Sequence, residues 1–259
     1  MAVLNVTPDS FSDGGRYLDP AIAEKKALQM QDEGAHILDI GGESSRPGSA
    51  PVSTREEIRR IAPVLKRLSK KIKIPVSVDT YKYDVAKAAL DEGAVIVNDI
   101  TALGDRRMAK LIARYGASVV LMHMRGTPAS MQKDPRYRSV MKEVKTYLKR
   151  SVDRALDGGI RKTRIAIDPG FGFGKTVEHN LVLLRDLEEM RSFKLPVLVG
   201  LSQKSFLGQL LGVPVEERLA GSLAAASAAI QRGAHLLRVH EVRPHRRLAA
   251  LLDSLQSAS

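Results

Sequence analysis

Residues 75–100 read "PVSVDTYKYDVAKAALDEGAVIVNDI" and contain one complete repeat of the pattern that decides the fold. The apolar runs "PVSVDT" at 75 and "VIVNDI" at 95 have the length of buried strands. Between them, residues 82–93 carry apolar side chains three and four positions apart, as in a helix, and Gly93 stands where a helix would end. This order predicts two parallel strands joined by a right-handed crossover.

The same alternation of strand and helix continues in both directions along the chain. We expect strands at residues 2–6, 36–40, 75–80, 95–100, 118–124, 164–168, 196–202 and 236–241. We expect helices at residues 20–34, 54–71, 82–93, 105–115, 141–157, 178–191, 216–232 and 243–256. Eight such units without a composition break favour closure into a barrel over an open doubly wound sheet. We therefore predict an α/β fold, a single (β/α)8 TIM barrel that forms one domain over residues 1–259.

The longest expected connection, residues 125–140, reads "RGTPASMQKDPRYRSV". It is too long for a plain turn between a strand and a helix. It is either a flap over an active site or an ordinary excursion on the surface.

Charge and cysteine content bound the classes of function. The chain has 41 Lys and Arg against 29 Asp and Glu, a net charge of +12, which could attract nucleic acid, anionic lipid or small anions. Much of this charge is spread out, so a solvated basic face is the simpler interpretation, and we expect no nucleic-acid partner. The absence of cysteine excludes disulfides and thiolate metal sites and is compatible with the cytoplasm. The apolar runs are far shorter than the ~20 residues of a membrane span, so we expect no membrane association.

Polar residues stand at the carboxyl ends of the expected strands, where barrel enzymes place their catalytic groups. They are Asn5, Asp39, Asp79, Asn98, His123, Asp168, Arg238 and His240. Any one Asp among them could be a helix N-cap, but six or seven in one ring are hard to explain that way. Carboxylates and amides suit a flat heterocycle with adjacent N–H donors, whereas Lys204, Arg238 and His240 suit a phosphate-like group. We expect a ligand with a polar ring at one end and an anion at the other.

The stretch "DPGFGFGKT" at 168–176 is similar to a nucleotide-binding P-loop but has the wrong spacing. Only three residues separate Gly170 from Gly174 where a P-loop requires four, and Pro169 occupies the place of its first glycine. The glycines instead predict a turn whose backbone passes close to a flat ligand. A flexible turn with incidental aromatic residues is the alternative.

Eight motifs in order and spacing resemble the dihydropteroate synthase family over nearly the whole chain. They are "NVTPDSFSDGG" (5–15), "DIGGESSRPG" (39–48), "SVDT" (77–80), "NDI" (98–100), "LMHM" (121–124), "DPGFGFGK" (168–175), "KS" (204–205) and "RVHE" (238–241). Each motif alone is weak, but the combination is highly specific. The resemblance implies a TIM barrel, usually dimeric, that condenses 6-hydroxymethyl-7,8-dihydropterin diphosphate with p-aminobenzoate, using Mg2+, to give 7,8-dihydropteroate and diphosphate.

The resemblance also implies roles for individual residues. The implied pterin pocket consists of Asp79, Asn98, Met122, Asp168, Gly200 and Lys204. The residues implied to bind the diphosphate are Asn5, Arg238 and His240, with Asn5 as a ligand of Mg2+. The implied catalytic residues are Asp79, Asn98, Asp168, Lys204, Arg238 and His240. The p-aminobenzoate and its loops involve Phe11, Asp13, Ser45, Arg46, Pro47, Phe171, Phe173 and Ser205.

The implied mechanism sets expectations for the loops at 6–16 and 43–51. Because water would quench a cationic intermediate, both loops are candidate lids, and Asp13 and Arg46 could pair across them or be unrelated surface charges. Arg46→Ala is expected to harm use of the amine more than binding of the pterin diphosphate. Backbone N–H groups of the segment that opens at Ser205 could hold the benzoate carboxylate.

Three departures from the family pattern bear on detail. Gln203 stands where the family motif usually has an arginine, which removes a cation. Ser45 replaces a common threonine and keeps the hydroxyl. Members usually have a segment ahead of the first strand, so we expect either an exposed barrel floor or further residues that precede Met1 in the protein. A pterin-dependent methyltransferase and a basic binding protein for RNA or anionic surfaces, built on a degenerate enzyme, are the alternative functions.

Overall fold

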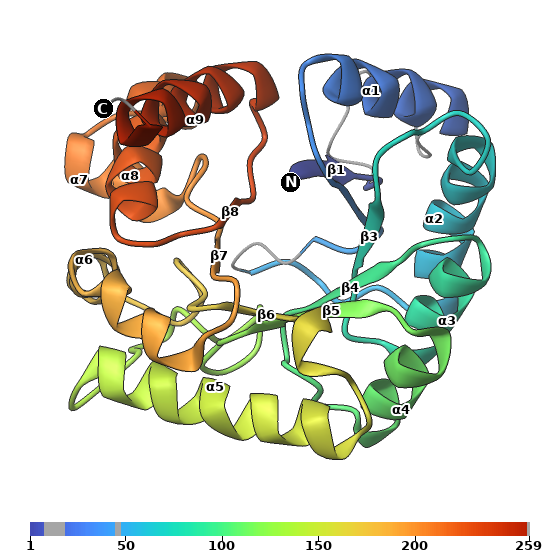
Figure 1. The fold of residues 1–259 in the computed structure, drawn as a ribbon, viewed down its shortest axis with the longest axis horizontal. Coiled ribbons are helices and arrows are strands. Elements are labelled where there is room, and N and C mark those ends of the chain that lie inside the picture. The colour runs from blue at the N-terminus through green and yellow to red at the C-terminus, as the bar shows by residue number, and fades with distance from the viewer. Residues whose placement is uncertain (8–18, 45–47, 258–259) are drawn as a thin grey trace.

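The strands form a closed ring (Figure 1). The computed structural model describes residues 1–7, 19–44 and 48–257. Within these ranges the strands are β1 (Ala2–Asn5), β2 (Leu38–Gly41), β3 (Val76–Asp79), β4 (Ile96–Asp99), β5 (Ser118–Met122), β6 (Ile165–Asp168), β7 (Leu198–Val199) and β8 (Leu236–Leu237). All pairings between them are parallel, in the order β1 to β6 in one sheet and β7 with β8 in a second.

Two single bridges join these sheets into a barrel. Ile167 pairs with Val197 between β6 and β7, and Ala2 pairs with Val239 beyond the end of β8. At the second junction the amide of Val3 donates to the carbonyl oxygen of Val239 at 2.9 Å. The predicted (β/α)8 barrel is therefore confirmed, although β7 and β8 are regular over fewer residues than the apolar runs at 196–202 and 236–241 suggest.

The helices surround the ring of strands in Figure 1. They are α1 (Pro20–Asp32), α2 (Thr54–Leu68), α3 (Tyr83–Asp91), α4 (Arg106–Tyr115), α5 (Val140–Asp157), α6 (Val177–Arg185), α7 (Ser205–Leu211), α8 (Leu219–Gln231) and α9 (Val242–Ser257). The helix predicted at 178–191 is wrong in its second half, where α6 gives way to a 3-10 helix at Leu187–Phe193. Leu187 and Met190 are buried there, so their spacing predicted burial correctly but not the type of helix.

Strand register explains which side chains face the barrel interior. Asn5 pairs with Gly41, Gly41 with Asp79, and Asp79 with Asn98, so these four residues lie in one row across β1 to β4. Side chains in a strand alternate between faces, so the neighbours of this row point outward toward the helices. Ile40, Val78 and Val97 occupy those positions and are fully buried.

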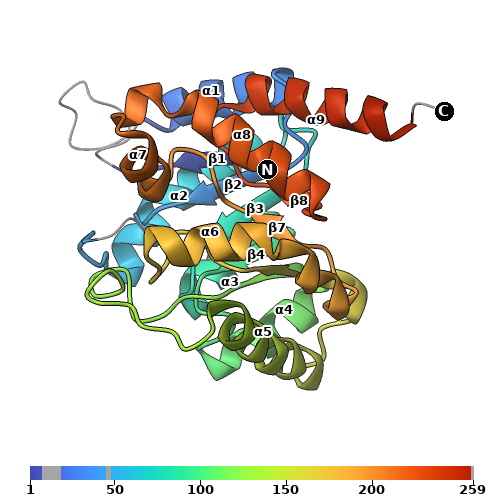
Figure 2. The same cartoon turned by 90° about the vertical axis from the view of Figure 1, so that its left-hand side faces the viewer.

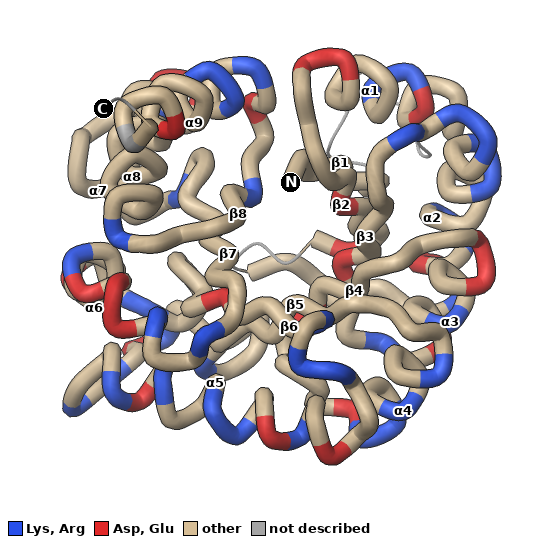
Figure 3. The backbone as a smooth tube through the Cα atoms, in the orientation of Figure 1, with Lys and Arg blue, Asp and Glu red and all other residues tan. Residues whose placement is uncertain are grey.

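Charged residues lie both outside and inside the ring. Figure 3 shows basic and acidic segments on the outer helices, and acidic segments inside the ring at β2 and β3. The connections between β2 and α2 and between β5 and α5 extend from the same end of the barrel (Figure 2). In the part of the chain that the structure describes, the helices are too short or too polar to cross a lipid bilayer.

Candidate active site

A polar pocket lies at the carboxyl ends of the strands. It is lined by Asp79, Asn98, Ile100, Met122, Asp168, Phe171, Phe173, Gly200, Lys204 and Arg238. These residues come from strands β3 to β6 and from the segments that follow β4, β6, β7 and β8. The structure therefore brings together every residue of the implied pterin pocket with one cation expected at the diphosphate.

Arg238 connects two carboxylates across the interior. Its Nε donates to Asp39 Oδ2 at 2.7 Å and its Nη2 donates to Asp79 Oδ2 at 2.6 Å. The amide Nδ2 of Asn98 also donates to Asp39 Oδ2, at 3.1 Å. Burial raises the pKa of Asp79 to about 7, because the charged form loses its hydration and the nearby guanidinium only partly compensates. Burial lowers the pKa of Arg238, but Asp39 and Asp79 more than offset this, and its pKa is raised.

Asn98 offers the pocket an acceptor rather than a donor. Its Nδ2 is used by Asp39, whereas its Oδ1 is buried and has no hydrogen-bond partner among the described residues. A buried amide oxygen without a partner carries a free-energy cost that a ligand N–H can remove. Asp99, the next residue, faces the other way and accepts from the amides of Thr101 and Leu103, as the alternation along the strand predicts.

Asp168 is the second carboxylate of the pocket and is 4% exposed. Its Oδ1 accepts from the amide of Gly170 at 2.7 Å. Burial raises the pKa of Asp168 to about 6, although this hydrogen bond and Lys204 oppose the shift. Burial also lowers the pKa of Lys204 to about 8. At neutral pH the pocket can thus hold an ionised carboxylate, ready to accept from N–H donors, beside a cation.

The glycines after Asp168 allow a backbone approach that other residues would prevent. A Cβ on Gly170 would lie 1.9 Å from the carbonyl oxygen of His123, and one on Gly174 would lie 2.4 Å from that of Arg125. Both glycines have positive φ, +70° and +66°. The turn is therefore packed against the segment after β5, which excludes a flexible turn. Gly170 and Gly174 leave room for the backbone of His123 and Arg125. The prediction that these two positions need glycine because a ligand passes close to them is therefore wrong.

Lys175, for which the sequence suggested no role, holds this turn in place. Its buried Nζ donates to the carbonyl oxygens of Gly170 and Phe173 at 2.8 and 3.0 Å and lies 3.0 Å from His123 Nδ1. Burial lowers the pKa of Lys175 to about 7. Burial and the charge of Lys175 together lower the pKa of His123 to about 2, so His123 is neutral and accepts this contact. A lysine that follows three closely spaced glycines was the signal for this role.

The 125–140 connection covers the glycine turn. Gln132 Nε2 donates to the carbonyl oxygen of Gly172 at 2.6 Å, and the hydroxyl of Tyr137 donates to that of Gly174 at 2.8 Å. Met131 packs in one buried cluster with Phe173 of the pocket. Of the two interpretations of this connection, the structure supports a cover for the site.

The two phenylalanines differ in their surroundings. Phe171 is 1% exposed and belongs to the main core, whereas Phe173 is 9% exposed and lies under Lys204, whose Nζ is 4.2 Å from the ring centroid. An ammonium over an aromatic face is a favourable contact. Both line the polar pocket, and their expected role at the p-aminobenzoate stays a prediction.

Three further predicted residues, Asn5, His240 and Ser205, are not part of the pocket lining. Asn5 is next to Asp79: a Cβ on Gly41 would lie 3.6 Å from Asn5 Oδ1 and 3.8 Å from Asp79 Oδ2. His240 Nδ1 is 3.2 Å from the hydroxyl of Ser202. Ser205 is exposed and begins α7.

Gln203 is turned toward Glu241, outside the pocket lining. Its Nε2 donates to Glu241 Oε1 at 2.6 Å, and its backbone has a φ of +59°. The residue that departs from the family motif therefore contacts another side chain instead of the pocket.

Five predicted residues fall outside the described part of the chain. They are Phe11, Asp13, Ser45, Arg46 and Pro47. Their expected roles at the p-aminobenzoate and in the loops stay predictions.

A second cavity lies at the opposite end of the barrel. It encloses about 220 Å³, against about 20 Å³ for the polar pocket, and its lining includes Met1, His36, Leu237 and His245. Barrel enzymes carry out their chemistry at the carboxyl ends of the strands, and this cavity is at the amino ends. The side chains, and not the volumes, identify the polar pocket as the active site.

A parallel eight-stranded barrel with carboxylates, an amide and cations at the carboxyl ends of its strands defines the class of TIM-barrel enzymes that act on small polar molecules. The family described as pterin binding enzyme matches residues 1–240. Dihydropteroate synthase of Escherichia coli (strain K12) is 47% identical over 243 residues, which cover 94% of this chain and 86% of that protein.

Solved structures agree. Xanthomonas albilineans dihydropteroate synthase with 4-aminobenzoic acid is 43% identical, with a TM-score of 0.94 and coverage of 100% of this chain and 93% of that one. The same enzyme in complex with 7,8-dihydropteroate has 41% identity, a TM-score of 0.90 and coverage of 100% and 93%. The chain therefore belongs to the pterin-binding enzyme family and, within it, to the dihydropteroate synthases, which are transferases of folate biosynthesis. The predicted family and activity are confirmed.

Proposed function

We propose that the polar pocket condenses 6-hydroxymethyl-7,8-dihydropterin diphosphate with p-aminobenzoate and releases diphosphate. The observation that carries this proposal is the joint presence of Asp79, Asp168 and the unpartnered Asn98 Oδ1 with Lys204 and Arg238 in one pocket. The acceptors suit the N–H groups of a pterin, and the cations suit the leaving polyanion.

Asp168 holds the pterin ring in this proposal. Because Oδ1 already accepts from Gly170, Oδ2 is the oxygen with the larger free capacity for the ring N–H and the amino group. Asn98 Oδ1 accepts a further N–H of the same edge. Met122 and Phe173 provide apolar surface for the flat ring.

The diphosphate lies toward Arg238 and Asn5. Asn5 Oδ1 fits Mg2+, a hard cation that is usually held by one or two protein oxygens while substrate phosphates and water complete its shell. Among the described residues there is no group of three acidic or imidazole side chains that would hold a metal alone. Asn5, next to Asp79, would hold Mg2+, which when bound would neutralise charge on the leaving diphosphate.

The C–O bond to the diphosphate breaks first, and its electron pair leaves with the diphosphate. The exocyclic CH2 carries the resulting positive charge, which the ring nitrogens share and which ionised Asp168 stabilises electrostatically. The amine of p-aminobenzoate then forms the C–N bond with its lone pair and loses a proton. An arylamine is unprotonated at neutral pH, so no general base is needed to activate it. Removing one preorganised charged group of this kind typically costs ~3 kcal/mol of barrier.

We further propose that the protein is a cytoplasmic homodimer. One face of α8, with Ser222, Ala225 and Ala229, is buried in its own barrel, whereas Ala220 and Ala224 are exposed. Leu210 and Leu211 of α7 are about half exposed and would be buried by a second copy. A monomeric mass by light scattering would exclude the dimer.

The activity is tested by measuring diphosphate release with both substrates, with and without Mg2+, and with each substrate omitted. Release that requires both substrates and yields dihydropteroate supports the proposal. Binding of the pterin diphosphate without product would instead support a binding protein.

A further inference from the structure

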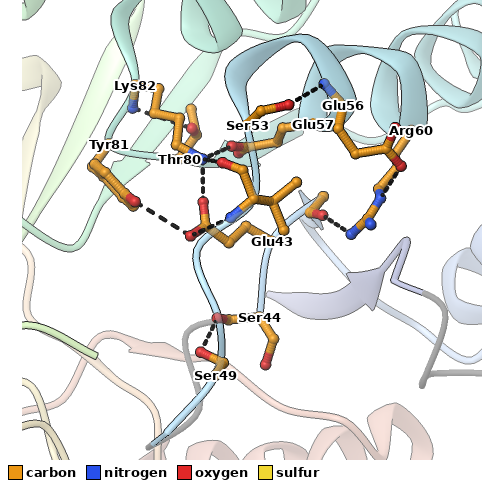
Figure 4. Close-up of polar contacts among 12 residues, drawn as sticks. Glu43, Ser44, Ser49, Ser53, Glu56, Glu57, Arg60, Thr80, Tyr81 and Lys82 are labelled. Atoms are coloured by element: carbon orange, nitrogen blue, oxygen red, sulfur yellow. Dashed lines mark hydrogen bonds and ion pairs between the residues drawn. The ribbon is translucent and has the colours of Figure 1, made fainter. Parts of the chain in front are cut away.

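One ammonium group binds both ends of the connection between β2 and α2. Lys82 Nζ donates to the carboxylate of Glu43, at the start of this connection, and to the carbonyl oxygen of Val52 at 2.6 Å, at its end. Its third contact is Glu57 Oε2 of α2, at 2.7 Å. Figure 4 shows Lys82 pointing between the two glutamates.

Additional hydrogen bonds reinforce this arrangement. Glu43 Oε1 accepts from the hydroxyl of Tyr81 at 3.2 Å and from the amide of Val52 at 3.4 Å. The group is largely shielded from water, since the side chains of Lys82, Glu43 and Glu57 are 14%, 12% and 1% exposed. Ion pairs are less screened in such surroundings than on the surface. The two ends of the connection, Glu43 and Val52, are nine residues apart in sequence. They are held together by their shared contacts with Lys82 and by the hydrogen bond between them.

The held connection borders the polar pocket. Glu43 and Ser44 line a small cavity that shares Asp79 and Ile100 with that pocket. Farther along the connection, the amide of Gly48 donates to the carbonyl oxygen of Pro128 at 3.1 Å, in the segment that covers the glycine turn. A shift of either end would therefore move groups next to bound substrate.

We propose that Lys82 is a positioning residue that fixes the β2–α2 connection at the edge of the active site and thereby determines how well p-aminobenzoate is used. The inference rests on the proposed function, because it is the resemblance to dihydropteroate synthases that assigns p-aminobenzoate to this connection. Lys82 acts through the backbone and the carboxylate that it holds, and it does not line the polar pocket.

The helices on either side have their own means of packing. α2 and α3 are in contact and contribute buried apolar side chains to one core: Ile61, Val64, Val85 and Ala89. Two of the three contacts of Lys82 are to the connection and only one is to a helix. Replacement of Lys82 is thus expected to free the connection while the helices stay packed.

The test compares Lys82→Met with Glu57→Gln. The glutamine keeps an oxygen for Lys82 and leaves both contacts to the connection intact, so it perturbs the same buried group without releasing the ends. We expect Lys82→Met to raise KM for p-aminobenzoate at least tenfold with KM for the pterin diphosphate within threefold of wild type. Glu57→Gln should change neither KM more than twofold, and Lys82→Arg should recover most of the loss.

Equal rises in both KM values for Lys82→Met, or the same selective rise in Glu57→Gln, would overturn the proposal in favour of general structural support. If Lys82→Met does not fold, Glu43→Met removes both oxygens that accept from Lys82, Val52 and Tyr81 while the Lys82–Glu57 pair remains, and it should show the same selective rise. Hydrogen exchange of peptides that cover residues 43–53 gives a readout without turnover. We expect faster exchange of these peptides in Lys82→Met than in Glu57→Gln. If the wild-type protein releases no diphosphate, the proposed function is refuted, and the exchange measurement alone then decides whether Lys82 fixes the connection.

Discussion

Asp168→Asn tests the proposed pterin contact most directly. The amide of Gly170 donates to Oδ1 at 2.7 Å, so the asparagine oxygen must take that position and its NH2 group must replace Oδ2. A donor would then face the N–H groups of the pterin. Loss of a hydrogen bond to a charged group costs about 1.5–3 kcal/mol, and the facing donors add to this. We expect pterin diphosphate to bind roughly 30- to 1000-fold more weakly, at about 1.4 kcal/mol for each factor of ten.

The stability of the same variant serves as its control. Burial raises the pKa of Asp168 from 3.8 to about 6, so above pH 6 its ionisation opposes folding, by about 3 kcal/mol at pH 7.5. Asparagine carries no charge, and the variant should unfold at a temperature no lower than wild type at pH 7.5. Calorimetric titration with the pterin diphosphate measures the affinity. A dissociation constant within threefold of wild type in a folded variant would refute the assignment of Asp168 to the pterin.

Three further predictions concern the same pocket. Gly170→Ala should lower kcat/KM at least tenfold, because its Cβ meets the carbonyl oxygen of His123. Gly116 has a similar φ of +61° and nothing within 4 Å of a Cβ, so Gly116→Ala should lower the free energy of unfolding by only the ~1–2 kcal/mol of that backbone conformation and leave kcat/KM unchanged. Equal losses of kcat/KM in the two variants would exclude the steric explanation. Arg238→Met leaves two buried carboxylates without their counter-charge and should lower the free energy of unfolding in urea at pH 8 by about 3–5 kcal/mol; a loss below ~1 kcal/mol would contradict the ion pairs. Pterin affinity should fall about tenfold from pH 7 to pH 5 as Asp168, whose pKa is about 6, takes up a proton, and titration of Asp168→Asn should lack this part of the decrease.

The polar pocket could be predicted from the sequence because parallel strands end at a common edge. Asp79, Asn98 and Asp168 each close an apolar run, and alternation along the strand gave the face of Asn98 correctly. Their meeting required only the alternation of strand and helix, which is a local property of the sequence.

Contacts that depend on strand register could not be predicted in this way. Asp39 lies two residues before the end of β2, and its pairing with Arg238, 199 residues away, depends on how β8 closes against β1. The contacts of Lys82 with Glu43 and Val52 are a similar case, because connections have no periodicity from which their path could be inferred. Patterns of apolar residues determine which strands meet, and side-chain geometry determines which charges pair.

The ion pairs of Arg238 are compatible with its expected role at the diphosphate. A guanidinium group has five N–H donors, and the described residues engage two of them, one with Asp39 and one with Asp79. Three donors therefore remain for an anion, and the two carboxylates fix the plane of the group before substrate binds. Asp79 also lines the pocket, so a pterin N–H that bonds to this carboxylate would release an N–H of Arg238 for the diphosphate. The two ends of the substrate are thus coupled through one side chain, and a pterin without its diphosphate should already strengthen the binding of free diphosphate.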